Sequence, residues 1–217
     1  MARVSKQASR IAAIFDRFAA ATADPRTELV YASPYTLLVS VVLSAQATDV
    51  SVNRATALLF AVADSPTAML ALGEARLTPF IASIGLFRTK ARNVIALSRI
   101  LIEQFGGEVP LDRTALQSLP GVGRKTASVV LNELGAETAI AVDTHVFRVA
   151  HRLGLSTGKT PEQAEADLMR VTPTARRSRA HHWLILHGRY VCLARKPKCA
   201  SCLVNDLCPS RSLFLGV

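Results

Sequence analysis

A lysine that follows a glycine turn is the first residue of this sequence with the means to do chemistry. The glycines of Gly121-Val122-Gly123 let the backbone turn tightly and leave its N–H groups unobstructed by side chains. An apolar stripe beyond the turn predicts that a helix begins there, with Lys125 in its first turn. Free N–H groups and the positive end of a helix dipole together form a site for one phosphate.

The amine of Lys125 could bind that phosphate or act as a nucleophile. A lysine is nucleophilic only when neutral, and its ordinary pKa of about 10.4 makes deprotonation at neutral pH cost roughly 4 to 5 kcal/mol. The helix N-terminus and neighbouring Arg124 disfavour a second positive charge, and burial in a closing cleft would lower the pKa further. The turn taken alone favours the phosphate-binding role.

A carboxylate, Asp143, stands before a second predicted helix, in Val142-Asp143-Thr144-His145. The usual role of an aspartate at such a place is to cap the helix. A capping carboxylate stays ionised and keeps one orientation, and a catalytic carboxylate needs both properties. Capping and catalysis are therefore compatible at this residue.

The cysteines form a second constellation, because all four lie in the last 26 residues and none lies elsewhere. Such clustering indicates one site. Disulfides are rare in a reducing compartment, where a basic chain without a secretory signal is expected to work. Four thiolates suit zinc and an iron–sulfur cluster equally, so the spacing C-x6-C-x2-C-x5-C leaves both open. The four residues are Cys192, Cys199, Cys202 and Cys208.

The composition describes a folded chain: of 217 residues, 50% are hydrophobic and 19% are charged. This length allows one large or two small domains with substantial cores. Apolar runs are too short to cross a bilayer, so no membrane partner is expected. The basic N-terminal stretch leads into an amphipathic pattern broken by Asp16 and Arg17, which does not resemble a secretory signal. We therefore expect a cytoplasmic protein.

The net charge of +10 is concentrated toward the C-terminus. Between Leu168 and Asn205 there are eight basic residues and no acidic one. A charge run is usually a solvated helix face. Together with a turn that can bind phosphate, however, this run favours a polyanion such as DNA as the partner. The eight are Arg170, Arg176, Arg177, Arg179, Arg189, Arg195, Lys196 and Lys198.

Helical patterns fill almost the whole chain, punctuated by Ser-Pro pairs, glycines and capping aspartates. No period-2 strand and no internal repeat is visible, so the predicted fold class is all-α. The predicted helices run over about 5–21, from 34, over 49–62 with Asp49 as its cap, from 66 with a break at Gly73, over 88–104 with Gly106-Gly107 as its end, over 112–118, from 124, and over 143–152, 161–171 and 174–190.

Several stretches together resemble the helix-hairpin-helix DNA glycosylases, and within them the bacterial endonuclease III branch. The resemblance extends from about residue 11 to residue 208. It implies a helical barrel domain with the hairpin at 27–137, a second domain made of 1–26 plus 138–217, and an active-site cleft between them. The matching stretches are LSAQATD (43–49), LPGVGRKTA (119–127), AVDTHVFR (141–148), HHWLILHGRYVC (181–192) and the four-cysteine tail.

The resemblance assigns catalytic roles to Lys125 and Asp143. It implies that Lys125 is the nucleophile, and that Asp143 faces it and stabilises the cationic sugar that develops as a base departs. It also implies that the four cysteines are the ligands of a structural [4Fe-4S] cluster that positions DNA-contacting loops. The basic residues between the first two cysteines fit that role; they are Arg195, Lys196 and Lys198.

Further DNA contacts follow from the same resemblance. Gln46 would enter the space that an extruded nucleotide leaves, and Leu86 would be an apolar wedge beside it, because base-extruding enzymes have to replace the lost stacking. His145 would lie at the pocket edge. On residue type alone, these three would be a turn residue, a core leucine and a packed histidine. Backbone contacts are expected from the hairpin residues Gly121, Val122 and Gly123.

The expected function is base excision with associated β-lyase activity. A monomer would remove oxidised pyrimidines from double-stranded DNA through a Lys125 Schiff base, also cut abasic sites, and work at the bacterial nucleoid. One alternative is a monofunctional adenine-type glycosylase. Against it, the apolar segment 37–43 has no carboxylate and Lys125 is present. The other alternative is a non-catalytic DNA-binding module whose cysteines hold zinc.

Overall fold

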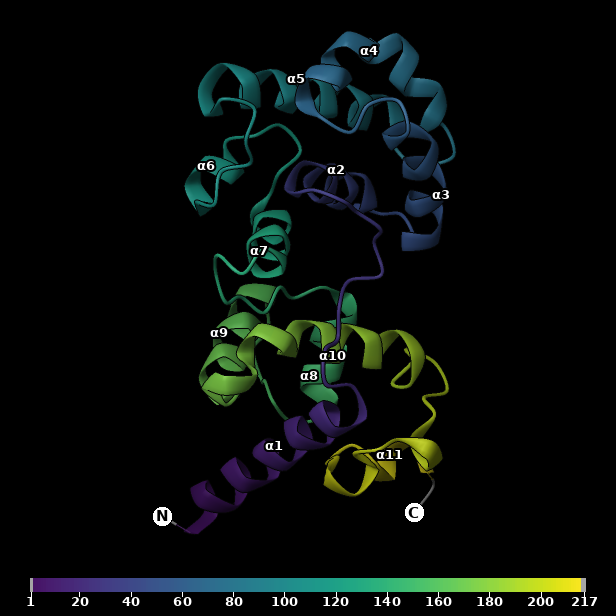
Figure 1. Ribbon diagram of the computed structural model, residues 1–217. Coiled ribbons are helices and arrows are strands. Elements are labelled where there is room, and N and C mark those ends of the chain that lie inside the picture. The colour runs from purple at the N-terminus through teal and green to yellow at the C-terminus, as the bar shows by residue number, and fades with distance from the viewer. Residues whose placement is uncertain (1, 216–217) are drawn as a thin grey trace. The chain divides into compact units, whose positions relative to one another are not determined.

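The computed structural model describes residues 2–215, and all regular secondary structure within this range is helical (Figure 1). The predicted all-α class is therefore confirmed. The chain divides into two compact units, one of residues Thr27–Glu137 and one that combines Met1–Arg26 with Thr138–Val217. None of the described helices is both long and apolar enough to cross a lipid bilayer.

The unit Thr27–Glu137 is built around α2 (Pro34–Ser44). Every residue of α2 from Tyr35 to Leu43 is buried, since a helix without a polar face belongs in a core. Ser33 caps it and Pro34 occupies its first turn, as the Ser-Pro pair predicts. Figure 1 shows the other helices of the unit around it. They are α3 (Asp49–Phe60), α4 (Pro66–Phe80), α5 (Phe87–Phe105), α6 (Arg113–Gln117) and α7 (Arg124–Glu133).

Helix starts in this unit follow polar capping residues. Ser65 and Asp112 cap α4 and α6 through side-chain hydrogen bonds. The start of α3 differs from the prediction, because Thr48 rather than Asp49 is the cap, and its hydroxyl accepts a hydrogen bond from Ser51 N. Asp49 lies instead in the first turn, where its carboxylate favours the positive end of the helix dipole.

Two predicted glycine breaks occur in α4 and α5. Gly73, with φ 75° and ψ 161°, interrupts α4, and Gly106, with φ 62°, ends α5. Both φ values lie in the left-handed region, which a residue without a Cβ adopts at little cost. The glycines therefore set the lengths of the helices that surround α2.

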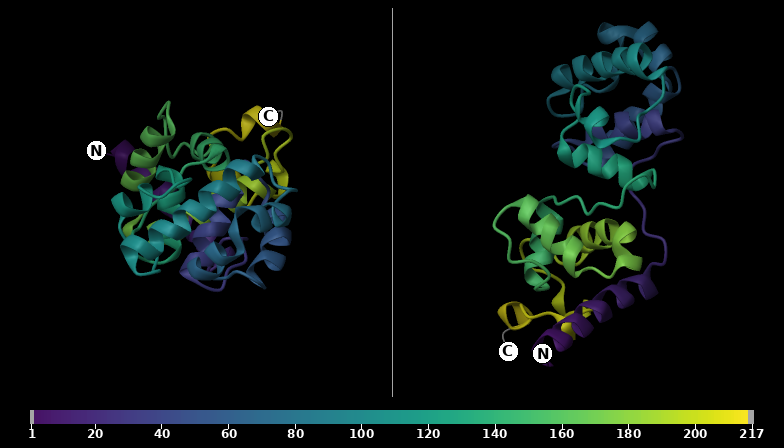
Figure 2. Two further views of the ribbon diagram at one scale, coloured as in Figure 1. Left: turned by 90° about the horizontal axis from the view of Figure 1, so that it is seen from above. Right: turned by 90° about the vertical axis from the view of Figure 1, so that its left-hand side faces the viewer.

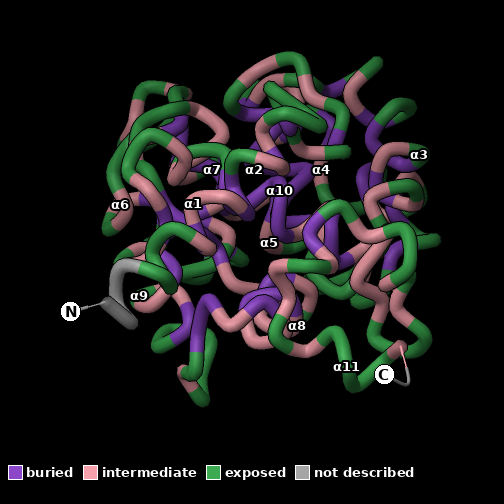
Figure 3. Tube along the Cα trace, turned by 90° about the horizontal axis from the view of Figure 1, so that it is seen from below, coloured by how far each residue is buried: buried purple, intermediate pink, exposed green. Residues whose placement is uncertain are grey.

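The second unit combines the N-terminal helix with the C-terminal third of the chain. In Figure 3, buried stretches are purple and include part of α10 (Arg177–Tyr190). The predicted helix 174–190 is divided, because Thr174–Arg176 forms a 3-10 turn before α10 begins. The other helices are α1 (Ala2–Ala21), α8 (Thr144–Arg152), α9 (Pro161–Val171) and the short α11 (Ser212–Leu215).

α1 is bound to the C-terminal segment by side-chain hydrogen bonds, and Figure 2 shows the two side by side. Arg10 Nη1 donates to the carbonyl of Leu207 (2.9 Å). Arg17 forms a two-nitrogen ion pair with Asp206, with Nη2 to Oδ2 at 2.8 Å. The first helix is therefore part of the same unit as the last residues of the chain.

The basic run of the C-terminal region is partly balanced inside this unit. Arg176 pairs with Asp16 at 2.9 Å and Arg179 with Asp24 at 3.7 Å, so acidic residues in and just after α1 meet arginines near the start of α10. Arg170 pairs with a carboxylate of its own helix, α9. Three of the eight basic residues of this run are therefore paired with carboxylates of the same unit.

Candidate active site and cysteine centre

The hairpin before α7 requires a glycine at position 121. Gly121 has φ 81°, and a Cβ on it would lie 3.0 Å from Asn93 Nδ2 and 3.2 Å from Val42 Cγ1. The turn is closed by a hydrogen bond from Val122 N to Leu119 O at 3.0 Å. The Val122 side chain is only 5% exposed and belongs to the core around α2. A ligand at the hairpin can therefore meet the backbone of Val122 but not its side chain.

The fold does not require the second glycine of the hairpin. Gly123 has φ −87° and ψ 178°, which any residue adopts, and a Cβ on it would meet no described atom within 4 Å. It is the N-cap of α7 but offers no capping side chain, whereas serine or aspartate there would stabilise the helix by a few tenths of a kcal/mol, roughly 0.3 kcal/mol. Residue 123 thus supplies no side chain that would bond the N–H groups of the first turn.

Lys125 lies in the first turn of α7, and its side chain is exposed. The buried face of α7 is formed by other residues, among them Ala127 and Leu131. Packing therefore leaves the amine on the same accessible turn as the hairpin N–H groups. An anion held by those groups would lie beside a lysine.

Asp143 caps α8, as its position predicts. One oxygen, Oδ1, accepts hydrogen bonds from His145 N (2.8 Å) and Val146 N (2.7 Å). These two N–H donors fix the orientation of the carboxylate. The side chain is half-buried, so its charge keeps some access to a ligand.

His145 is held by an arginine that sequence reasoning missed. Arg148 Nη2 lies 3.3 Å from His145 Nδ1, and since arginine can only donate, Nδ1 accepts. Arg148 also donates to Gly188 O (2.8 Å) and Cys192 O (3.0 Å). The start of α8 is therefore connected to α10 and to the first cysteine. The AVDTHVFR stretch contains Arg148, but its sequence does not show which carbonyls the side chain reaches.

Gln46 and Leu86 lie on neighbouring turns of the unit Thr27–Glu137. Both have left-handed backbones, with φ 55° for Gln46 and φ 59° for Leu86, although neither is glycine. Both are exposed, and the Leu86 side chain has 62% of its surface in solvent. A Cβ on Gly85 would lie 3.6 Å from Gln46 O, so the turns touch. Leu86 is thus not a core residue, which its type alone would suggest.

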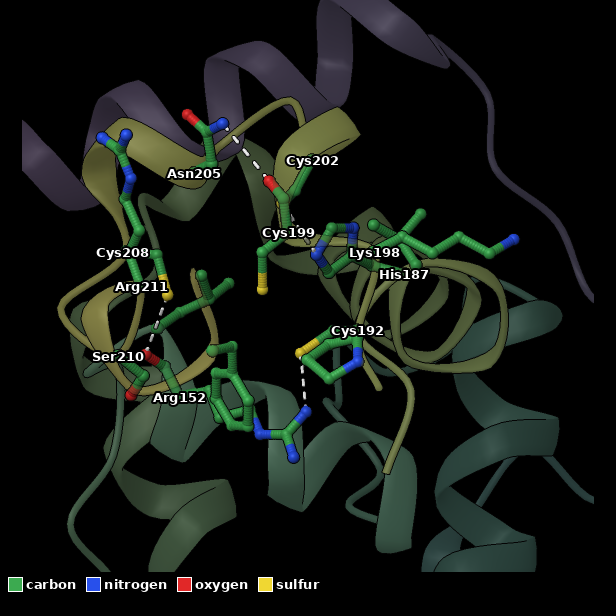
Figure 4. Close-up of a pocket in the computed structure, with 14 residues that line it drawn as sticks. Arg152, His187, Cys192, Lys198, Cys199, Cys202, Asn205, Cys208, Ser210 and Arg211 are labelled. Carbon is green, nitrogen blue, oxygen red and sulfur yellow. Dashed lines mark hydrogen bonds between the residues drawn. The ribbon is translucent and has the colours of Figure 1, made fainter. Parts of the chain in front are cut away.

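The four cysteines are free thiols that line one pocket (Figure 4). Leu153, Val191, Pro197 and Phe214 supply apolar wall atoms. Burial raises the pKa of the Cys202 and Cys208 thiols, and repulsion from the other cysteines raises it further. Thiolates at these places need a strong positive charge among them, and metal ligation provides one.

The four cysteines share one pocket but are not arranged around one ion. Within the described residues, no group of three or more His, Cys, Asp or Glu side chains is arranged to hold a single metal ion. Tetrahedral zinc would draw its thiolates to about 2.3 Å from one centre. A [4Fe-4S] core takes four thiolates, and the four cysteines that line this pocket match that number. The zinc alternative is therefore not supported.

Polar groups also surround the cysteine sulfurs. Arg152 Nη1 donates to Cys192 Sγ at 3.4 Å, and His187 Nε2 lies 3.6 Å from Cys202 Sγ. Burial lowers the pKa of His187 to about 4, so its ring is neutral near neutral pH. Hydrogen bonds to ligand sulfurs are a common way for a protein to support a cluster.

The segment between the first two cysteines is an ordered loop with basic side chains outside. Arg152 donates to the carbonyls of Leu193 (2.7 Å) and Ala194 (3.0 Å). Lys198 N closes the loop onto Val191 O at 2.9 Å. The residues predicted to contact DNA here are all exposed: Arg195, Lys196 and Lys198.

Two family models match the chain. Residues 39–174 match the model described as HhH-GPD superfamily base excision DNA repair protein. Residues 192–208, which span the four cysteines, match the iron-sulfur binding domain of endonuclease III.

Curated relatives are similar over nearly their whole length. Endonuclease III of Treponema pallidum (strain Nichols) is 58% identical over 196 residues, which cover 90% of this chain and 93% of the relative. Endonuclease III of Escherichia coli (strain K12) is 57% identical over 184 residues, covering 85% and 87%.

Solved structures give the same similarity in three dimensions. A trapped endonuclease III–DNA covalent intermediate matches with a TM-score of 0.85 at 44% identity, covering 92% of this chain and 94% of the other. A non-covalent endonuclease III–DNA complex matches with a TM-score of 0.87 at 43% identity, covering 94% and 96%.

Proposed function

This chain belongs to the endonuclease III family of HhH-GPD base excision DNA repair proteins, and we propose that Lys125 and Asp143 carry out its reaction on oxidised pyrimidines. The enzyme is a DNA glycosylase with associated abasic-site lyase activity, and it carries a [4Fe-4S] cluster. The nucleophile, the carboxylate and the substrate preference are the parts that we propose.

The hairpin binds the DNA backbone in this proposal. The N–H groups at the start of α7 donate hydrogen bonds to one phosphate, at a helix start where the N-cap residue has no side chain to bond them. The exposed loop that carries Arg195, Lys196 and Lys198 adds cationic phosphate contacts. Gln46 and Leu86 fill the space left by the extruded nucleotide.

Base removal uses Lys125 as the nucleophile. Its neutral amine forms a bond to C1′ of the extruded nucleotide, while the bond from C1′ to the base breaks and its electron pair leaves with the base. The ionised Asp143, fixed by its two N–H donors, stabilises positive charge on the sugar during this step. The base takes a proton as it leaves.

Strand cleavage follows from the covalent adduct. The sugar ring opens and the nitrogen forms a Schiff base with C1′, which acidifies the hydrogen on C2′. Loss of that proton and breakage of the C3′–O bond cut the strand on the 3′ side by β-elimination. The phosphate that leaves C3′ remains at the 5′ end of the downstream strand. Water then hydrolyses the Schiff base and restores the lysine amine. The same last steps cut a pre-existing abasic site.

One observation carries this proposal more than any other. The helix that holds Lys125 begins at a glycine that neither the backbone angles nor the packing requires, and which costs the helix a side-chain cap. A helix start without a capping side chain, next to an exposed lysine, is suited to bind an anionic ligand. The cluster, when bound, links the segment Cys192–Cys208 and so holds the basic loop in place.

The adenine-type alternative is not supported. α2 contains no carboxylate, and Ser40, near its centre, is fully buried. The curated relatives with the highest identities reported above are endonuclease III proteins. We further propose that the enzyme works as a monomer at the bacterial nucleoid.

Borohydride trapping on a thymine glycol duplex tests the proposal. The wild-type protein should give a covalent protein–DNA adduct when borohydride is present, and cut strands when it is absent. Lys125→Ala should give no adduct. Lys159→Ala, which changes an exposed lysine of the other unit, is the matched control and should trap like the wild type. An adduct that persists in Lys125→Ala would refute the assignment.

A further inference from the structure

A buried ammonium group lies behind the Gln46 and Leu86 turns. Lys90, in the first turn of α5, has only 5% of its surface exposed. Among the described residues no carboxylate bonds it, and burial lowers its pKa. Lysines are almost never fully buried unless they are paired, so the partners of this one have to be identified. Neither the cluster nor the proposed chemistry uses it.

The partners of Lys90 are backbone carbonyls at the end of α2. Its Nζ donates to Leu43 O at 2.9 Å and to Ala45 O at 2.6 Å. Carbonyls at a helix C-terminus lack partners within the helix, and a cation there is also favourable toward the negative end of the dipole. Next to these bonds, Ala47 N donates to Ser44 O at 3.0 Å and closes the turn around Gln46.

The same lysine belongs to the helix that follows Leu86. Its own backbone N–H donates to Leu86 O at 3.0 Å, as the first helical bond of α5. One residue therefore contacts both turns, through its ammonium on one side and its backbone on the other. Both turns hold a non-glycine residue in the left-handed region, which costs free energy that the surrounding structure has to offset.

We propose that Lys90 is a positioning residue, which holds the Gln46 and Leu86 turns in the shape that fills the space left by an extruded nucleotide. This inference rests on the proposed function, because it takes from it the roles of Gln46 and Leu86. A lysine suits the task better than an apolar residue of the same length, since it donates to two carbonyls at once. It acts through the turns and does not touch the reacting atoms.

A purely structural role for Lys90 makes a different prediction. If the lysine only caps α2, its loss should lower stability and reduce activity equally on every DNA substrate. If it positions the two turns, its loss should affect duplex DNA, where a nucleotide has to be extruded and replaced. Single-stranded DNA with an abasic site needs no such replacement and should be cut normally.

The experiment compares Lys90→Met, which keeps the length and removes the donors, with Lys90→Arg, which can bond both carbonyls. Ser98→Ala is the control, because Ser98 is equally buried in α5 but bonds the Tyr35 hydroxyl, away from the turns. Each variant is assayed on a thymine glycol duplex and on a single strand with an abasic site, at a temperature where all are folded.

Lys90→Met should lower the duplex rate about tenfold, equivalent to about 1.4 kcal/mol of transition-state free energy. It should leave the single-strand rate unchanged, and Lys90→Arg should restore most of the duplex rate. In a double-mutant cycle, Lys90→Met should add little to Gln46→Ala, because both remove the same plug. Should Lys90→Met not fold, Lys90→Gln takes its place with a smaller loss confined to the duplex.

Equal losses on both substrates, or full additivity with Gln46→Ala, would overturn the inference and leave Lys90 as a helix cap. Failure of the proposed function is seen separately. In that case, the wild-type protein would give no borohydride adduct on either substrate.

Discussion

At the scale of single residues, the two glycines of the hairpin have different roles, one in folding and one in ligand binding. Gly121 is required by its φ of 81° and by the nearby atoms of Asn93 and Val42. Gly123 has an ordinary φ and open space around it. The sequence shows two glycines in one turn, and only the structure shows that they are present for different reasons.

Alanine at each glycine should therefore act on a different property. Gly121→Ala should lower the free energy of unfolding by about 1–3 kcal/mol, because alanine is strained at positive φ and would crowd Asn93. Gly123→Ala should cost less than about 1 kcal/mol, because alanine fits the φ of this position but is a poorer N-cap than glycine. It should weaken duplex binding about tenfold, since its methyl group obstructs an approaching phosphate. Urea unfolding and DNA titration measure the two effects, and equal DNA affinities would contradict this assignment.

Asp143 allows a substitution that preserves its cap. Asparagine caps helices about as well as aspartate, so Asp143→Asn should keep the hydrogen bonds from His145 N and Val146 N and leave stability nearly unchanged. Without the charge, base excision should fall by at least about a hundredfold, the effect of removing one electrostatic group from a transition state. Single-turnover excision and duplex binding are the measurements. Unchanged excision would reduce Asp143 to a cap.

At the scale of helices, local sequence signals determine most boundaries. Ser-Pro pairs begin α2 and α4, and Gly106 ends α5, as predicted. These signals are local because a cap satisfies backbone groups within one turn. The sequence predicts Asp49 as the cap of α3, whereas the structure has Thr48. The two could not be distinguished, because both residue types cap well and they are adjacent in the chain.

Roles that depend on packing could not be predicted from the sequence. Arginine and lysine are usually exposed, so the sequence suggests surface positions for Arg148 and Lys90. Only the fold shows that both side chains donate to carbonyls far away in the sequence. The basic run near α10 was assigned to a polyanion, but acidic residues about 160 positions earlier pair with part of it. Sequence patterns of period 3.6 identify a helix face without identifying its neighbour.

The close contact between α8 and α10 gives a prediction at this scale. A Cβ on Gly188 would lie 2.9 Å from His145 Cβ and 3.1 Å from Val149 Cγ2. Gly188→Ala should therefore displace the start of α8 and lower the free energy of unfolding by about 1–3 kcal/mol. Because Asp143 stands at that start, the rate of base excision should fall more than the affinity for duplex DNA.

Arg179→Ala, on the same helix but in a solvent-exposed ion pair, is the control for Gly188→Ala and should cost less than about 1 kcal/mol. Thermal unfolding and single-turnover excision measure both variants. If Gly188→Ala had wild-type stability and excision, α8 and α10 would be able to move apart without loss of free energy of unfolding, and the prediction would be wrong.

At the scale of the whole molecule, the two units have separate hydrophobic cores. One contains α2 and its neighbours, and the other contains Phe15, Trp183 and Val204, with Cys192, Cys202 and Cys208 packed against it. The cysteine centre therefore contributes directly to the second core only. Its wall residues and the contacts of Arg10 and Arg17 connect it to α1.

Loss of the cluster should consequently affect one unit. Cys202→Ser, or removal of iron by a chelator, should remove the yellow-brown colour and lower the unfolding temperature of the unit that contains α1 and α8–α11. The unit Thr27–Glu137 should keep its helicity, so a second transition at the original temperature is expected by circular dichroism. Duplex affinity should fall with the colour. Colourless protein with a single wild-type transition would contradict this division.

The ion pair of Arg17 with Asp206 joins residues 189 positions apart. During synthesis on the ribosome, the first helix therefore emerges long before its partner exists. The segment Thr27–Glu137 can acquire its core while translation continues, whereas the first helix has to wait for the last cysteines. Iron–sulfur loading can consequently be completed only after Cys208 has been translated, so a translation product that ends before it would contain a folded hairpin unit and an unassembled remainder.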